Sequence, residues 1–257
     1  MIFTTDHHNS ILLHKIFHLI SNLTNDVNLQ FKYDGLYIQA NKCNTCITNI
    51  YFNYKFFTEY KYINDITIAI YSKSILHILE HLIKLNTIIE FKYCIDDLKL
   101  YISSTNNYTI TYSLNTLYIN INNINIINHS SYSFRINHTE FNNLINECCK
   151  LEIDDIIFSI DKKNTKIICN GTIINAEIEL NSLLTHLNFN NSTAIECIDN
   201  FKNTYKLQYF KYLTYINNNS DITISLDKDM PIFINIDFHN YYCNIECIIA
   251  SQLLHHT

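Results

Sequence analysis

The chain has 257 residues, 47% of them hydrophobic, and a formal net charge of −6 with histidine taken as neutral. This length and hydrophobic content allow one large domain or two of ordinary size with a substantial core. With only two glycines and one proline, the chain has no glycine-rich phosphate-binding loop, and its charge excludes a simple basic nucleic-acid binder. Either nucleic acid is not the partner, or positive charge is concentrated on one face of an acidic molecule.

The first half of the chain alternates strand and helix patterns. Ile2–Thr5 is predicted as a strand, and Ser10 as the N-cap of an amphipathic helix over Ile11–Ser21. Asp34-Gly35 is a hairpin signal that places a glycine where positive φ is needed. The other predicted elements are the strands Val27–Phe31, Leu36–Ala40, Thr45–Phe52, Tyr60–Ile63 and Thr67–Tyr71, the helix Ser72–Lys84, and the strands Thr87–Tyr93, Leu98–Ser103 and Tyr108–Leu114.

Residues 116–131 are rich in asparagine and isoleucine and show no helical period. They separate two similar halves, so we predict an inter-domain connector. A linker that only joins domains is normally polar, yet this one carries several isoleucines. Two interpretations stay open: a strand that packs along both halves, or a connector that helps to wall an exposed apolar pocket.

The second half repeats the order of the first. Its predicted elements are the strand Tyr132–Ile136, the helix Thr139–Lys150, the hairpin strands Ile156–Ile160 and Lys166–Cys169, the strand Ala176–Leu180, a loop over Leu187–Thr193, the strand Ala194–Ile198, the helix Lys206–Ile216, and the strands Asp221–Leu226, Ile232–Ile236 and Cys243–Ala250. The helix segment Ser74–Leu82 aligns with Gln208–Ile216, and the hairpin Asp26–Ala40 aligns with Asp155–Cys169. Such internal repetition predicts two similar domains, over 1–115 and 132–257.

The polar sides of the predicted helices gather basic, titratable and amide groups. In the first half, histidines alternate with lysines, diluted by Glu80; in the second, asparagines predominate. A solvated helix face explains this pattern, and so does a face turned to a polyanion. On the first helix alone the solvated face is favoured.

No catalytic constellation emerges from the sequence. Cys43-x-x-Cys46 lies in an alternating strand pattern that would turn its cysteines to different sides, so buried, reduced structural cysteines are favoured over a metal pair. No serine, histidine and aspartate share a recognisable spacing. Asp96-Asp97 and Asp154-Asp155 fall in turns or at a helix end, where turn and capping roles suffice. We therefore expect neither an enzyme nor a bound metal or cofactor. The N-terminus lacks a secretory pattern, and no hydrophobic run reaches the roughly 18 residues of a membrane span, so we expect an intracellular protein.

Several short motifs, in order and at matching intervals, resemble sliding clamps of the proliferating cell nuclear antigen (PCNA) type over nearly the full length. The motifs are Ser10-Ile11-Leu12, Asp34-Gly35-Leu36 with Ile38-Gln39-Ala40, the spacing from Phe57 to Tyr60 and from Ser74 to Leu79, Leu207-Gln208-Tyr209-Phe210 with Asp229-Met230-Pro231, and Ile248-Ile249-Ala250. Each is weak alone, and together with the duplication they are fairly specific.

The resemblance implies an α+β DNA clamp, the processivity fold. Each of two similar domains has β-sheets outside and two helices inside, and three chains close a ring. The homotrimer would encircle double-stranded DNA without regard to sequence and tether DNA polymerase and other replication and repair proteins. A clamp loader and proteins with short aromatic-anchored motifs are the further partners implied, with no membrane partner. The resemblance implies a nuclear location, or a viral replication site for a viral protein.

The resemblance also assigns three surfaces by matched position. The DNA-facing residues are His14, Lys15, His18, Lys73, His77, His81, Lys84, Asn143, Asn146, Lys150 and Lys211. The client pocket comprises Ala40, Ile47, Ile124, Ile126, Pro231, Ile248, Ile249 and Ala250. The trimer interface pairs the edge strand Tyr108–Asn115, with Tyr108, Ile110, Tyr112 and Leu114, against Glu177–Leu183 of the next subunit, with Glu177, Ile178, Glu179 and Leu180.

The chain departs from the family where inner positions lose their basic side chains. Positions that are lysine or arginine in the family are here Leu13, Ile20, His77, Glu80, Asn143, Asn146 and Tyr215. This predicts a weak electrostatic grip on DNA that strengthens below about pH 6.5, where histidine gains charge. The usual Tyr and Pro of the last strand are Ile248 and Ser251. The depleted charge supports an alternative, a non-encircling clamp-fold processivity, transcription or checkpoint factor that acts through protein contacts. A metal-dependent enzyme using histidine and cysteine is a third, weaker interpretation.

Overall fold

The computed structural model describes residues 1–117, 124–130, 132–160, 165–171, 175–180, 200–216, 221–238 and 242–252. Its contacts divide the chain into two compact units. Unit 1 consists of Met1–Cys43, Ile47–Ile124 and Asp237–Ile245, and unit 2 of Asn44–Cys46, Asn125–Ile236 and Glu246–Thr257. Each unit therefore includes a short segment from the other half of the sequence. No helix in the described ranges is long and apolar enough to cross a membrane.

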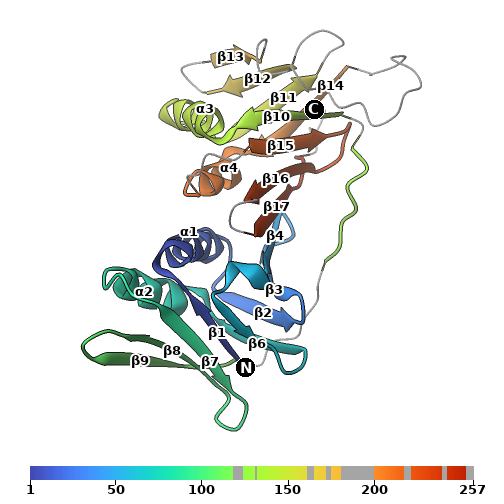
Figure 1. The fold of residues 1–257 in the computed structure, drawn as a ribbon. Coiled ribbons are helices and arrows are strands. Elements are labelled where there is room, and N and C mark those ends of the chain that lie inside the picture. The colour runs from blue at the N-terminus through green and yellow to red at the C-terminus, as the bar shows by residue number, and fades with distance from the viewer. Residues whose placement is uncertain are drawn as a thin grey trace. The chain divides into compact units, whose positions relative to one another are not determined.

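Unit 1 has two helices and two antiparallel sheets. Its elements are β1 (Ile2–Thr5), α1 (His7–Leu23), β2 (Asp26–Lys32), β3 (Gly35–Lys42), β4 (Cys46–Asn53), the 3₁₀ turn η1 (Tyr54–Phe56), β5 (Glu59–Lys61), β6 (Ile66–Tyr71), α2 (Ser72–Ile83), β7 (Ile89–Cys94), β8 (Lys99–Thr105) and β9 (Thr109–Asn115). One sheet has the order β5-β1-β7-β8-β9, and in the other β4, β3, β2 and β6 are neighbours. Figure 1 shows α1 beside α2.

Unit 2 repeats this arrangement. Its elements are β10 (Tyr132–Asn137), α3 (His138–Lys150), β11 (Asp155–Ile160), β12 (Thr165–Asn170), β13 (Asn175–Glu179), β14 (Phe201–Lys206), α4 (Leu207–Leu213), β15 (Asp221–Leu226), β16 (Ile232–Phe238) and β17 (Cys243–Ile249), the last two shared with unit 1. One sheet has the order β13-β12-β11-β14, and β10, β15, β16 and β17 are neighbours in the other. The predicted α+β class and the internal duplication are confirmed.

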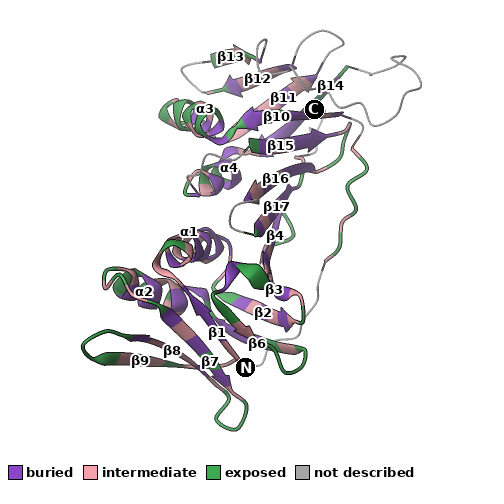
Figure 2. Ribbon diagram, in the orientation of Figure 1, coloured by how far each residue is buried: buried purple, intermediate pink, exposed green. Residues whose placement is uncertain are grey.

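The hydrophobic core of each unit lies between its helices and sheets. In unit 1, the rings of Phe52 and Phe56 are 4.6 Å apart between centroids and fully buried. In unit 2, Phe158 of β11 stacks on Phe210 of α4 at 5.8 Å. Figure 2 shows the resulting pattern, with buried residues along the strands and the inner sides of the helices. Burial of aromatic side chains of this size is the main source of stability for such layers.

The first helix begins one turn earlier than the sequence predicted. Asp6 is the N-cap, and its Oδ1 accepts a hydrogen bond of 2.8 Å from the Asn9 N–H. Ser10 is therefore not the N-cap; it is fully buried inside α1, and its Oγ donates to the Asp6 carbonyl at 2.7 Å. The prediction was wrong because Asp6 also satisfies cap chemistry, and the hydrophobic period becomes visible only from Ile11.

Two further elements differ from prediction. The last helix spans only Leu207–Leu213, and it is preceded by the unpredicted strand β14. The predicted loop Leu187–Thr193 and strand Ala194–Ile198 lie outside the described residues.

Gly35 opens β3 at a position that no other residue fits. Its φ is +150°, and a Cβ built there would lie 2.0 Å from the Phe52 carbonyl oxygen. We expect Gly35→Ala to lower the free energy of unfolding by at least about 2 kcal/mol, because the strand backbones must separate and the residue is strained. Urea denaturation followed by circular dichroism measures this, and an unchanged midpoint would contradict the close approach.

Candidate nucleic-acid interface and partner surfaces

The helices of unit 1 present the predicted DNA-facing residues unequally. On α2 and its C-cap, Lys73, His77, His81 and Lys84 are exposed. On α1, His14, Lys15 and His18 are half-buried. The carboxylate of Glu80 lies 3.9 Å from both His77 Nδ1 and Lys84 Nζ. Glu80 therefore neutralises part of the positive charge on the most exposed helix face of this unit.

His14 is the titratable group that the packing of the two helices affects most clearly. Burial lowers the pKa of His14; the nearby Glu80 opposes this effect, and His18 and Lys15 add to it. His14 consequently carries less positive charge near neutral pH than a solvated histidine. Its contribution to an anion-binding face should appear only at lower pH.

The same shift predicts how His14 affects stability. Because the folded-state pKa lies below the ordinary value of about 6.5, the neutral ring favours the folded state. This stabilisation is complete above the unfolded pKa and is lost as pH falls through the folded pKa. We expect His14→Gln to lose less stability than wild type between about pH 7 and pH 5. Paired urea titrations test this, and parallel losses would contradict it.

Two positions that the resemblance placed on the inner face belong to the core instead. Leu13 and Ile20 are 1% and 0% exposed. Their apolar side chains pack under α1, so they remove no charge from its surface. The expectation of lost surface charge is therefore wrong at these two positions.

The helices of unit 2 are more weakly charged. Asn143, Asn146, Lys150 and Lys211 are all exposed. Lys150 Nζ is bound to the Glu147 carboxylate at 2.5 Å, one turn away on α3. Within α1–α4 there are four lysines and three glutamates, so the helices are nearly neutral while the whole chain is acidic.

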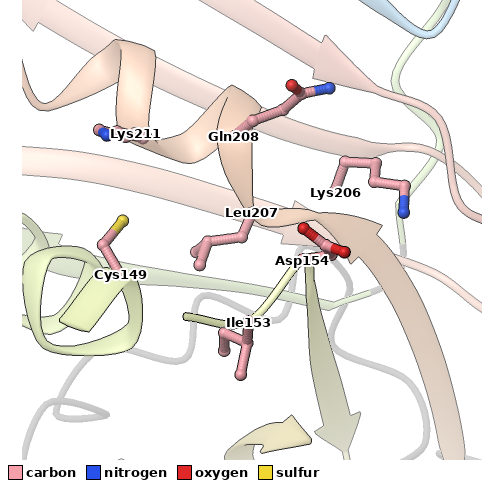
Figure 3. A pocket seen from close by; sticks show the side chains of 7 residues that line it. All are labelled: Cys149, Ile153, Asp154, Lys206, Leu207, Gln208 and Lys211. Atoms are coloured by element: carbon pink, nitrogen blue, oxygen red, sulfur yellow. The ribbon is translucent and has the colours of Figure 1, made fainter. Parts of the chain in front are cut away.

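A cavity of about 400 Å³ opens where α3 ends and α4 begins. Its lining residues are Cys149, Ile153, Asp154, Lys206, Leu207, Gln208 and Lys211 (Figure 3). Lys206 is bound to Asp155 at 2.8 Å, and Figure 3 shows it at the far side of the cavity from Lys211. The cavity thus adjoins Lys211, a predicted DNA-facing residue. Its other lysine, Lys206, was not predicted as part of any site.

In each unit, the strand predicted for the trimer interface is the edge strand of a sheet. β9 is terminal in its five-stranded sheet and β13 in its four-stranded sheet. Along both strands exposed residues alternate with half-buried ones, which places Ile110, Tyr112 and Leu114 on one side of β9. On β13, Ile178 is half-buried, Glu177 and Glu179 are exposed and bind Lys166, and Leu180 beyond it is buried.

β9 is also linked to the exposed helix face. Tyr112 Oη lies 2.6 Å from His81 Nδ1 of α2, whereas Tyr108, before the strand, is 63% exposed. Open β-edges with hydrophobic rows are surfaces that pair readily with another strand.

The predicted client-pocket residues differ in how much surface they offer. Ala40, Ile47, Ile248 and Ile249 are almost fully buried. Ile124, Ile126 and Pro231 are half-buried and Ala250 is exposed. Only the second group presents substantial surface for contact within the described structure, and the assignment of the pocket stays a prediction.

Most of the cysteines that the structure describes lie in the core. Cys43 is exposed in a turn at φ 51°, while Cys46 is buried with its Sγ 3.6 Å from that of Cys247. In unit 2, the Sγ atoms of Cys148 and Cys169 are 3.2 Å apart. Across the described ranges, no three histidine, cysteine, aspartate or glutamate side chains gather as a metal site requires.

Comparison with known proteins identifies the family to which this architecture is similar. Residues 126–251 match the family model of the proliferating cell nuclear antigen C-terminal domain. A search of curated proteins found no match.

Solved structures match over nearly the whole chain. A chain of the PCNA2–PCNA3 complex from Sulfolobus tokodaii is 16% identical with a TM-score of 0.83, covering 98% of this chain and 99% of its own. Entamoeba histolytica PCNA is 14% identical with a TM-score of 0.83, covering 98% of each chain. PCNA of A. fulgidus, solved with the C-terminal region of FEN-1, is 16% identical with a TM-score of 0.81, again covering 98% of each.

Proposed function

Since residues 126–251 carry the PCNA C-terminal domain pattern and the chain has the fold of a divergent PCNA-type clamp, we propose that it is a sliding clamp. Three copies would encircle double-stranded DNA and tether DNA polymerase and other replication and repair proteins. The observation that carries the proposal is the full-length clamp fold with an edge strand at each predicted interface, β9 and β13. The protein would act as a non-enzymatic scaffold in the nucleus, or at a viral replication site for a viral chain.

The helix chemistry supports contact with DNA that is weak and independent of sequence. Exposed lysines and asparagines can reach phosphate oxygens, which fix position without reading bases. With few net positive charges, the grip should be loose and its dependence on salt shallow. Such contacts suit a protein that moves along the duplex.

The deciding experiment measures mass in solution by light scattering behind a sizing column, over a dilution series. A closed trimer would weigh about 91 kDa, three times 30.4 kDa. A stable trimer supports the ring, and retention on circular but not linearised plasmid is then the next test. A monomer at every concentration, with or without linear DNA, would refute the self-closing ring.

Binding of partners is tested separately with a labelled peptide of the C-terminal region of A. fulgidus FEN-1, the segment bound to that PCNA. Saturable binding, competed by unlabelled peptide, supports a client pocket. Failure of this peptide together with peptides of other aromatic-anchored motifs would remove the tethering role.

The second candidate function is a clamp-fold factor that does not encircle DNA. The near-neutral helices, with Glu80 beside His77 and Lys84, favour it. A monomer that still binds the peptide would select this alternative.

A further inference from the structure

Gln39 forms an unusual contact between the sheet of unit 1 and the predicted connector. Its side-chain Oε1 accepts a hydrogen bond of 3.0 Å from the Ile124 backbone N–H. Its Nε2 donates to the Ile124 carbonyl oxygen, also at 3.0 Å. One side-chain amide thus satisfies both backbone groups of a residue 85 positions away, as a neighbouring strand would.

Gln39 itself is held in place by the sheet. It lies on the outward side of β3, directly opposite Asn28 of β2. Its Nε2 also donates to Asn49 Oδ1 of β4 at 2.7 Å. Amide side chains therefore form a row across three strands, and within the described structure the buried Asn28 Oδ1 of this row has no hydrogen-bond partner. A fixed amide loses little rotamer freedom when it binds the connector.

At the start of the connector, Thr116 and Leu117 donate backbone hydrogen bonds to the Leu98 and Ala69 carbonyl oxygens; the described residues 124–130 have little besides Gln39 to hold them by hydrogen bonds. Over the described residues 124–130, the other backbone hydrogen bond is from Ser130 N–H to Asn128 Oδ1, inside the segment. Burial then alternates from half-buried Ile124 and Ile126 to exposed Asn125 and Ile127. Side chains of extended backbone alternate in this way, so fixing one residue decides which side its neighbours face.

We propose that Gln39 is a positioning residue that anchors the connector at Ile124 and thereby sets which side chains it offers to a bound protein segment. This inference rests on the proposed function, because Ile124 and Ile126 belong to the predicted client pocket. Without the anchor the connector samples other registers, and a client must first select the correct one. The apparent affinity for the client is therefore the intrinsic affinity multiplied by the fraction of chains in that register.

The anchor is tested first without any client, by hydrogen exchange of the intact protein followed by mass spectrometry. In Gln39→Leu, the Ile124 amide loses its acceptor and should exchange about tenfold faster or more, as expected for the loss of hydrogen bonds. Gln30→Leu is the matched control, because Gln30 of β2 is a glutamine on the same side of the sheet as Gln39. Equal exchange at Ile124 in both variants would overturn the anchor.

The second test measures affinity for the FEN-1 peptide. Gln39→Leu should weaken binding about tenfold with an unchanged thermal midpoint. Gln39→Glu serves as a second variant, since its carboxylate keeps the size and can accept from Ile124 N–H but cannot donate to the carbonyl. Unchanged affinity in both variants alongside accelerated exchange would overturn the positioning role. If the wild type does not bind the peptide, the tethering proposal fails, and the exchange experiment still decides the anchor.

A double-mutant cycle separates positioning from general stabilisation. Ile124→Pro removes the N–H that donates to Gln39 Oε1 and keeps the carbonyl oxygen that accepts from Gln39 Nε2. If Gln39 acts through Ile124, adding Gln39→Leu to Ile124→Pro should accelerate exchange in residues 125–130 less than Gln39→Leu does in the wild type. Additive effects of the two substitutions on exchange would contradict the proposal.

Discussion

Ile110→Asp is expected to leave the protein monomeric at concentrations where the wild type is trimeric. Ile110 is half-buried on β9, the terminal strand of its sheet. In the proposed ring a second chain would cover this strand, so the substitution would bury a carboxylate without a partner. The cost is at least about 2 kcal/mol for each interface. Three identical interfaces would lose about 6 kcal/mol, on the order of 10⁴-fold in the trimer equilibrium.

Light scattering over a dilution series measures the change, from about 91 kDa, three times 30.4 kDa, to 30.4 kDa. Ile95→Asp is the matched control, because Ile95 is 56% exposed in the turn before β8 and the charge change is identical. It should remain trimeric. A trimer of the Ile110→Asp protein, with undiminished stability to dilution, would show that β9 is not in the interface.

The alternating strands were the most predictable part of this fold. β9 and β13 follow a period of two without interruption, and such a pattern specifies a half-buried strand. β14 was not predicted because Asn203 shares its buried side with Phe201 and Tyr205, and Thr204 on the opposite side is buried as well. Asn203 is accommodated by tertiary hydrogen bonds, with Nδ2 donating to the Asp227 carbonyl at 2.6 Å. A strand whose buried side is polar has no signature in hydrophobic periodicity.

The sites were less predictable than the strands because they depend on distant partners. The polar side of α2 follows directly from helical spacing, and its residues are exposed as expected. On α1, Leu13 and Ile20 were assigned to the inner face by matched position, but the core of unit 1 buries them. Gln39 has an ordinary outward position in β3, and nothing in its local sequence indicates the contact with Ile124.

Glu80→Lys is expected to strengthen DNA binding markedly at low salt. The substitution removes the carboxylate beside His77 and Lys84 and adds a cation at an exposed site of α2. If three subunits surround the duplex, three new lysines reach phosphates, and the slope of log K against log salt steepens by about 3. The gain over wild type should then shrink roughly 40-fold between 50 and 200 mM salt. Fluorescence anisotropy with a labelled short duplex measures both quantities.

Glu59→Lys is the matched control for this substitution. Glu59 on β5 is also exposed and paired with a lysine, Lys61, at 2.7 Å, and the change in net charge is the same. Equal gains from both variants would show that net charge, not the helix face, controls DNA binding. The size of the change in slope also counts subunits on DNA, because a monomer that lies against the duplex adds one lysine and steepens it by about 1. The loss of Glu80 also removes an influence that raises the pKa of His14, so the added lysine, not His14, must supply the new charge at neutral pH.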